Sequence, residues 1–317
     1  MNGTFPRSES GRSYEITGAN GALLANASRA SRKDARDAVV AARTAFPNWW
    51  GATAYNRGQV LYRVAEVLEG RSAQFAADVA AAEGASHRQA LRTVLAAIDR
   101  LVWYAGWADK FAQVIGTANP VAGPYFNFSV PEPTGVVAVL APVSSSLLGL
   151  VSVLAPVVVT GNTAVVVASE SRPLPAIALA EVLATSDVPA GAVNMLTGRQ
   201  SELAPVLAAH MDVNAIDLTG SPGRDRADLE TLAAENLKRV FSPGAGGPDA
   251  GSDGAGGPDA GSDGAGGPDA GSDGAGSPRP GAPRAGTPGD GDWRASPGLA
   301  RMRAFVEIKT VWHPAGT

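Results

Sequence analysis

The serines and histidines come first in a search for chemistry, because the sequence contains no cysteine. Without cysteine the chain cannot form disulfides, thiolate metal sites or a thiol nucleophile. Three consecutive serines occupy positions 144–146, and a serine hydrolase would need one of them beside a histidine base. However, there is no GxSxG motif, and His87, His210 and His313 show no triad spacing. We therefore expect loop serines that cap the following helix.

The other candidates for acid–base or metal chemistry are isolated in the sequence. Glu132 and Glu170 show no pattern of a paired-carboxylate site. His87 stands at a predicted helix start and His313 follows a predicted strand, so both are expected to be solvated rather than to bind a metal. These residues predict no metal site.

The elements that would position these residues are short apolar runs that alternate with segments of helical length. Buried parallel strands are predicted at 136–140, 163–167, 192–196 and 214–218, with crossover helices at 147–159, 175–185 and 201–210. Continuous apolar strands joined by helices predict an α/β fold, with a Rossmann-like parallel sheet covered on both faces. Ligands of such sheets bind beyond the carboxyl ends of the strands. The loops at those ends are 141–146, 168–171, 197–198 and 219–223.

Further elements are predicted on both sides of this sheet. Paired strands at 14–27 precede a helix that Ser31 caps and Pro47 ends, and three more helices follow at 55–68, 73–82 and 86–113. A strand at 125–130 could form a hairpin arm, and 225–240 is predicted as one helix. A short helix at 297–303 precedes a strand at 305–312. That last strand either completes a sheet in this chain or adds to a partner's edge, because a strand alone is marginal.

Residues 244–292 form a low-complexity segment in which GAGGPDAGSD occurs three times. The segment has no large apolar residue whose burial could offset the entropy of ordering. It also lacks the apolar position of calcium-binding nonapeptide repeats. We predict a disordered linker between an N-terminal domain at 1–243 and a C-terminal helix and strand at 293–317.

The segment 244–292 holds eight Asp and two Arg, which leaves the rest of the chain nearly neutral. That balance gives no indication of a nucleic-acid or acidic-membrane partner. The longest apolar run, 147–159, is shorter than the roughly 20 residues of a membrane span, and the first residues contain no secretory signal. We therefore expect a cytoplasmic protein.

Several motifs in series resemble one family. NGTFPRSESGR, GVVAVLAP, TGNTAVVVASES, DVPAGAVNMLTG, DLTGSPG and MRAFVEIKTVW follow one another along the chain. In this order they resemble the aldehyde dehydrogenase superfamily, and most closely its atypical branch with non-catalytic domains. The resemblance covers about 2–240 and 293–312. It implies that family's NAD-binding domain, its N-terminal helices and its C-terminal oligomerisation strand.

The resemblance also implies a missing catalytic part. In the family, a catalytic domain with a nucleophilic Cys lies between the NAD-binding domain and the last strand, and a Glu acts as general base. The thiolate attacks the aldehyde, and the resulting thiohemiacetal passes hydride to NAD. Here the low-complexity segment stands in that place. Ser144 occupies the position of the family's oxyanion Asn, and losing such a donor typically lowers the rate roughly 10²–10³-fold. No catalytic residue is therefore assigned.

The cofactor motifs of the family are only partly retained. The matching positions are Ser169, Glu170, Gly198, Gly220 and Ser221. The family's Lys-Pro-Ser-Glu motif, which holds the adenosine ribose, reads Val-Ala-Ser-Glu here and lacks the Lys. Asp225 and Asp228 would oppose an anion at the start of the next helix. Two alternatives stay open, namely weak binding of NAD or NADP and lost binding.

These observations predict a catalytically inactive homologue, a pseudoenzyme. It would form homo-oligomers, or hetero-oligomers with a full-length aldehyde dehydrogenase that it scaffolds or regulates. One alternative is an NAD(P)-binding module. The other is a nominal aldehyde oxidoreductase that is active only with a partner chain.

Overall fold

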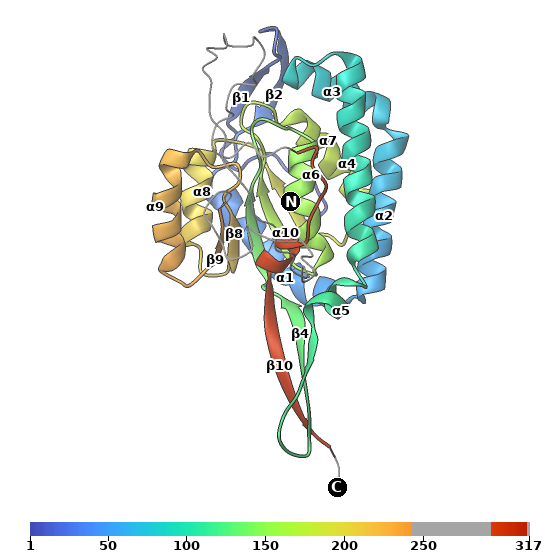
Figure 1. Cartoon of the computed structure of the whole chain (residues 1–317). Coiled ribbons are helices and arrows are strands. Elements are labelled where there is room, and N and C mark those ends of the chain that lie inside the picture. Colours follow the sequence, from blue (N-terminus) through green and yellow to red (C-terminus); the bar gives the residue numbers. More distant parts are fainter. Residues whose placement is uncertain (243–292, 316–317) are drawn as a thin grey trace, which may run out of the picture.

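A computed structural model describes residues 1–242 and 293–315, so the predicted linker lies outside the described residues. The described chain forms a body with a parallel sheet between helical layers, from which a narrow arm of β-strands projects (Figure 1). The predicted α/β class with a Rossmann-like sheet is confirmed.

The central sheet has the order β7-β6-β5-β8-β9, and every neighbouring pair is parallel. Its strands are β5 (Val136–Leu140), β6 (Thr163–Val167), β7 (Val193–Leu196), β8 (Ala215–Asp217) and β9 (Arg239–Phe241). The connecting helices are α6 (Leu148–Val159), α7 (Leu174–Ala184), α8 (Gln200–Ala209) and α9 (Gly223–Ala234). The order reverses at β5, since β6 and β7 lie on one side of it and β8 and β9 on the other. Such a reversal is where ligands of open α/β sheets bind.

Alternate side chains of β5 enter two separate cores, as the two-residue period of a strand requires. Val136, Ala138 and Leu140 pack in a core that includes α1 (Arg32–Gly51), α8 and α9. Val137 and Val139 pack in the other, with α2 (Ala54–Gly70), α4 (His87–Trp107), α6 and α7. Because helices cover both faces, β5 and β6 are buried along their whole length.

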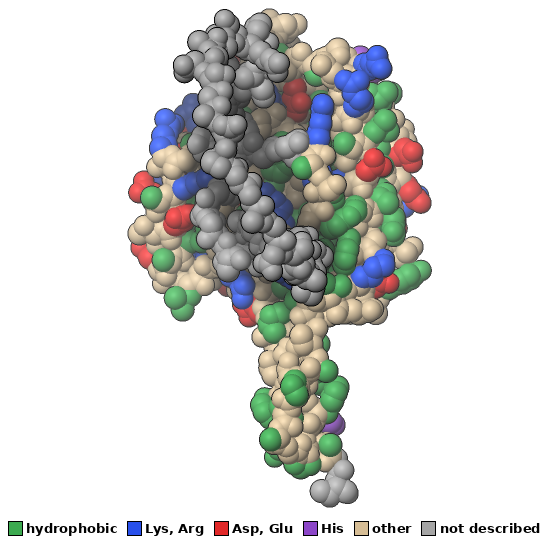
Figure 2. All heavy atoms as spheres, viewed as in Figure 1, with side chains coloured by type: hydrophobic (Ala, Val, Ile, Leu, Met, Phe, Trp, Pro, Cys, Tyr) green, Lys and Arg blue, Asp and Glu red, His purple; other side chains and the backbone are tan. Residues whose placement is uncertain are grey.

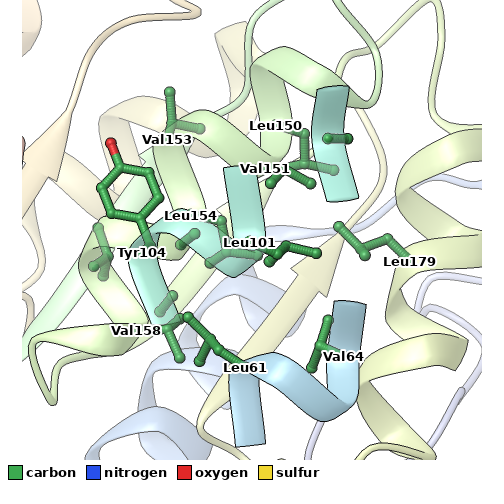
Figure 3. Close-up of a cluster of buried hydrophobic side chains, with 14 of the residues drawn as sticks. Leu61, Val64, Leu101, Tyr104, Leu150, Val151, Val153, Leu154, Val158 and Leu179 are labelled. Atoms are coloured by element: carbon green, nitrogen blue, oxygen red, sulfur yellow. The ribbon is translucent and has the colours of Figure 1, made fainter. Parts of the chain in front are cut away.

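The second core joins helices that are distant in sequence. Figure 3 shows Leu61 of α2, Leu101 of α4, Leu154 of α6 and Leu179 of α7 in one cluster of buried side chains. Helices α3 (Ser72–Glu83) and α5 (Phe111–Ile115) also contribute to this core, whereas β1 (Ser13–Thr17) and β2 (Leu23–Ser28) form a separate antiparallel pair. The N-terminal helices α2 to α5 therefore pack on one face of the sheet.

The start of α1 was predicted correctly, but its end was not. Ser31 Oγ accepts from the Asp34 N–H, and the Asp34 carboxylate accepts from the Ser31 N–H, which closes a capping box. The helix then continues through Pro47 to Gly51. Trp49 explains the extension, because its buried indole N–H donates to the Val158 carbonyl at 3.0 Å and holds the last turn in place.

The predicted helix at 86–113 is two helices. The Ala108 N–H bonds to the Ala105 carbonyl at 3.2 Å, a tighter turn than in an α-helix, and α5 then begins at Phe111. Phe111 is buried, so the change of direction places an aromatic ring in the core.

The predicted helix at 225–240 is also wrong in its second half. Helix α9 ends at Ala234, and Leu237 has a positive φ of 58° that a helix cannot accommodate. Val240 then pairs with Ile216 in the fifth strand, β9. The apolar residues expected on one helix face are therefore divided, with Leu237 in solvent and Val240 in the sheet.

The arm consists of β3 (Thr117–Asn119), β4 (Tyr125–Pro133) and β10 (Val306–Pro314) in the order β10-β4-β3. β10 pairs antiparallel with β4 over nine residue pairs, from Val306↔Pro133 to Pro314↔Tyr125. The terminal strand therefore completes a sheet within this chain. Figure 1 shows β4 and β10 extending well away from the body.

The C-terminal segment, residues 293–314, joins the arm to the body through α10 (Ala300–Ala304), which is shorter than the predicted helix. Met302 and Phe305 are fully buried in the core. The Phe305 carbonyl accepts from Asn162 Nδ2 at 2.8 Å and from the Thr134 N–H at 3.2 Å. Apolar burial and hydrogen bonds thus fix the base of β10.

Candidate functional site

The candidate residues lie at one edge of the sheet, because the carboxyl ends of parallel strands meet there. The loops after β5, β6, β7 and β8 hold Ser144, Ser169 with Glu170, Gly198, and Gly220 with Ser221, respectively. We call this the carboxyl edge. The structure therefore brings the predicted positions to one side of the molecule, but their immediate surroundings differ.

The three serines after β5 have different surroundings. Ser145 Oγ accepts from the Gly149 N–H at 2.9 Å, but the N-cap residue of α6 is Leu147, so Ser145 supports the first turn without being its N-cap. Ser146 donates from both its N–H and its hydroxyl to Glu83 Oε1 at 2.7 Å. Ser144 is exposed, and its carbonyl accepts from Arg172 Nη1 at 3.2 Å. Ser145 and Ser146 are therefore committed to contacts within the protein.

Glu170 and Arg199 form the polar part of the carboxyl edge between β6 and β7. Glu170 is about half exposed, and Arg199 Nε lies 3.8 Å from its Oε1. Arg199 also lies 3.8 Å from Glu202, whose pKa is lowered by the Arg29 hydrogen bond and by the charge of Arg199. Arg199 thus supplies a cation beside Glu170, although Val167 stands at the position of the Lys in the family's motif.

Arg199 was missed in the sequence, although it directly follows the predicted strand-end loop at 197–198. Tyr14 was also missed, since nothing local connects the N-terminal hairpin to β6. Burial raises the pKa of Tyr14 to about 12, the Glu170 charge adds to the rise, and the Gly198 backbone opposes it. Tyr14 Oη and Ser169 Oγ are both buried without a hydrogen-bond partner.

The glycines of the carboxyl edge are required by the packing of the protein itself. A Cβ on Gly220 would lie 2.1 Å from the Ala141 carbonyl oxygen, and the Gly220 N–H donates to the Leu140 carbonyl. Gly198 has a φ of +141°, which side chains rarely adopt. Ser221 is buried, and its hydroxyl makes only a long contact of 3.4 Å to the Pro222 carbonyl.

The residues present fit one half of a dinucleotide better than the other. Glu170 and Arg199 present a carboxylate and a guanidinium at the surface, which suits a ribose or a phosphate. At the reversal of strand order, Gln200 Nε2 donates to the Ala141 carbonyl at 3.1 Å, and Gly220 packs against the same oxygen. The Ala141 carbonyl at the end of β5 is therefore engaged by the protein itself.

One buried ion pair lies next to the carboxyl edge and was not foreseen. Asp217, the last residue of β8, is fully buried, and its Oδ2 lies 2.5 Å from Arg301 Nη1 of α10. Arg301 Nη2 also donates to Thr219 Oγ1 at 3.1 Å. The only local signal was an acidic residue inside an apolar strand, because the partner is 84 residues away.

The described cavities lie mostly away from these loops. One of about 230 Å³ lies between the N-terminal segment and α7, and reaches the carboxyl edge at Thr197. Another of about 270 Å³ lies near Arg57 and the base of the arm. Among residues 1–242 and 293–315, no group of three or more acidic or histidine side chains is placed to hold a metal. No helix of that same part is both long and apolar enough to cross a membrane.

A model of the aldehyde dehydrogenase family matches residues 5–248. The chain belongs to the aldehyde dehydrogenase family. It is 32% identical over 244 residues to aldehyde dehydrogenase family 2 member B4 of Arabidopsis thaliana, covering 76% of this chain and 45% of that protein. It is 34% identical to retinal dehydrogenase 2 of Gallus gallus over 245 residues, covering 76% and 47%.

Solved structures share the fold, among them a putative aldehyde dehydrogenase of Burkholderia cenocepacia with a TM-score of 0.72 at 28% identity, covering 76% of this chain and 49% of that chain. PnpE of Pseudomonas sp. WBC-3 superimposes with a TM-score of 0.71 at 27% identity, covering 76% of this chain and 49% of PnpE. A second structure of PnpE is a complex with nicotinamide adenine dinucleotide. The chain thus spans about half the length of the relatives and solved structures that it matches.

Proposed function

We propose that this chain is a non-catalytic aldehyde dehydrogenase homologue that assembles through its arm. Its partner is a second copy of itself or a full-length aldehyde dehydrogenase, which it scaffolds or regulates. The observation that carries the proposal is the arm, a sheet that projects from the body and exposes both apolar side chains and a strand edge.

The edge of β10 is suited to pairing with another chain. β10 is the outer strand of the arm in the order β10-β4-β3, and it is nine residues long. Within the described residues, its second edge pairs with no other strand. A long edge strand offers a row of N–H and C=O groups that another strand can complete.

The arm also exposes large apolar side chains, which Figure 2 shows along its length. Ile308 and Trp312 of β10 are 53% and 60% exposed, and Tyr125 and Phe126 of β4 are 48% and 55% exposed. Aromatic residues are enriched at protein interfaces, and clustered exposed apolar groups mark interaction sites. The face carrying Ile308 and Trp312 therefore supports an assembly role.

The proposal that the chain is non-catalytic rests on the absence of the family's catalytic side chains. The chain has no cysteine, and Ser144 stands where the family has its oxyanion Asn. Ser145 and Ser146 are used to start α6 and to bind Glu83. No other described group replaces the thiolate, because a serine nucleophile would need an adjacent base such as histidine.

Substitution of exposed arm residues tests the proposal. The double substitution Ile308→Asp with Trp312→Asp places charge on exposed arm positions, so the body should fold unchanged. Tyr55→Asp, on α2 and also exposed, is the matched control. Sedimentation velocity should find oligomers of the wild type and of Tyr55→Asp, and monomers of the double variant. A wild type that is monomeric alone and with a full-length aldehyde dehydrogenase would reject the proposal.

A second candidate function is binding of NAD or NADP without chemistry. Glu170, half exposed with Arg199 beside it, favours this candidate. Titration calorimetry with each cofactor is the test, and Glu170→Gln should weaken any binding. Absence of both heat and thermal shift at millimolar cofactor would eliminate the candidate.

A further inference from the structure

We propose that Arg301 is a positioning residue for the loop after β8. It fastens the C-terminal segment to Thr219, so that the shape of the loop at 219–221 depends on the docked segment. This inference goes beyond assembly, because it links the base of the arm to the carboxyl edge of the sheet.

Three groups form a closed set of contacts at this point. Arg301 bridges Asp217 Oδ2 and Thr219 Oγ1 with its two terminal nitrogens, at 2.5 and 3.1 Å. The Thr219 N–H and hydroxyl both donate to the other Asp217 oxygen, Oδ1, with the N–H at 2.9 Å. The guanidinium thus fixes the carboxylate and the first residue of the loop together.

Aromatic rings hold the guanidinium from the C-terminal side and from the sheet. Arg301 Cζ lies 4.4 Å from the Phe241 ring centroid and 5.8 Å from that of Trp293. Arg100 Nη2 donates to the Trp293 carbonyl at 2.9 Å and to the Ala295 carbonyl at 2.8 Å. Arg301 therefore has little freedom to leave Asp217, and it is only 17% exposed.

The loop beyond Thr219 leads directly to the candidate cofactor residues. The Gly220 N–H donates to the Leu140 carbonyl and the Ser221 N–H to the Leu218 carbonyl, each at 2.9 Å. Without Arg301, Asp217 would be a buried carboxylate without a cation, which is strongly unfavourable. The simplest relief is for the loop to open and admit water to Asp217.

The same contacts imply coupling in both directions. A ligand that binds the ordered loop would favour docking of the C-terminal segment, and docking would favour the ligand by the same factor. This consequence rests on the second candidate function, binding of NAD or NADP. The ordering of the loop itself rests on neither proposed function.

Hydrogen exchange of the full chain tests the positioning role. In Arg301→Met the amides of Thr219, Gly220 and Ser221 should exchange about tenfold faster, while the slower amides of β5 stay protected over the same labelling times. Asp217→Asn with Arg301→Met removes the unpaired charge, and its loop should still exchange several-fold faster than the wild type. Arg301→Lys should be intermediate, because one ammonium cannot serve Asp217 and Thr219 as a fork does.

Arg239→Met is the matched control, since Arg239 also faces the C-terminal segment but lies 3.9 Å from Glu307 and is exposed. Its loop should exchange at the wild-type rate. Wild-type loop rates in the Asp217→Asn, Arg301→Met variant would show that Arg301 only balances a charge, and would overturn the proposal. In the same double variant, an increase in β5 equal to that in the loop would overturn the proposal too, because the effect would then be global.

Cofactor affinity gives a separate outcome. If the wild type binds NAD or NADP, Arg301→Met should weaken binding about tenfold and Arg239→Met should not. Unchanged affinity would contradict the coupling. If the wild type binds neither cofactor, the second candidate function fails, and the exchange rates still decide the role of Arg301.

Discussion

The carboxyl edge of the sheet and the C-terminal segment are held by contacts of very different kinds. At the carboxyl edge, Glu170 and Arg199 are half exposed and 3.8 Å apart, and Ser144 is exposed. In the C-terminal segment, Arg301 reaches a fully buried Asp217, and Phe305 is fully buried. The difference indicates that docking of the C-terminal segment depends on buried contacts, whereas Glu170 and Arg199 form only an exposed pair.

Substitution of Arg301 should give the largest effect on stability. Arg301→Met leaves Asp217 buried and unpaired, so the free energy of unfolding should fall by about 3–5 kcal/mol. Asp217→Asn with Arg301→Met should recover much of this loss, because no unpaired charge remains. Urea unfolding measures both variants. If the free energy of unfolding of Arg301→Met falls by less than about 1 kcal/mol, the Arg301–Asp217 pair stabilises the fold no more than an exposed surface pair does.

Substitution of two aromatic residues of the C-terminal segment should affect docking of the segment and assembly of the chain separately. Phe305→Ala opens a cavity in the core and should lower the free energy of unfolding by about 3–5 kcal/mol. Trp312→Ala alters an exposed arm residue and should change it by less than about 1 kcal/mol while weakening self-association. Thermal unfolding and sedimentation velocity together test the pair. Equal destabilisation by both substitutions would contradict the assignment of Phe305 to docking and of Trp312 to assembly.

A substitution at the carboxyl edge should change the free energy of unfolding only slightly. Arg199→Ala breaks an exposed pair with Glu170, so the free energy of unfolding should change by about 0.5 kcal/mol or less. If NAD or NADP binds, the same substitution should lower its affinity, because the cation beside Glu170 is removed. A fall of several kcal/mol in the free energy of unfolding would show that the Glu170–Arg199 pair stabilises the fold as strongly as the contacts of the C-terminal segment do.

The smallest effect is expected for Ser144→Asn on the oxidation of aldehydes. Ser144→Asn restores the family's oxyanion residue, yet the chain still lacks a cysteine, so no NADH should form from a panel of aldehydes. The assay needs protein free of other dehydrogenases. NADH formation by the wild-type chain alone would contradict the proposal of a non-catalytic homologue.

The sequence predicted the local elements well where one physical signal dominated. The bounds of β5 and β6 were predicted correctly because their apolar runs end at polar loops, and Ser31 was recognised as a cap. Pro47 failed as a helix end, because the distant Val158 carbonyl holds the final turn through Trp49. Tertiary contacts of this kind have no local signature.

The candidate site was predicted less completely for the same reason. The motif positions at Glu170 and Gly220 could be located, but the cation beside Glu170 comes from a different strand end, at Arg199. The partner of Asp217 lies 84 residues along the chain. Side chains that meet only through topology cannot be paired from one sequence.

The most direct test of the assembly role is native mass spectrometry of this chain mixed with a full-length aldehyde dehydrogenase from the same source, alongside this chain alone. The account predicts oligomers that contain this chain, either with the partner or as copies of itself, and their loss in the variant with Asp at positions 308 and 312. Free monomer of this chain in both samples, beside unmixed partner oligomers, would contradict it.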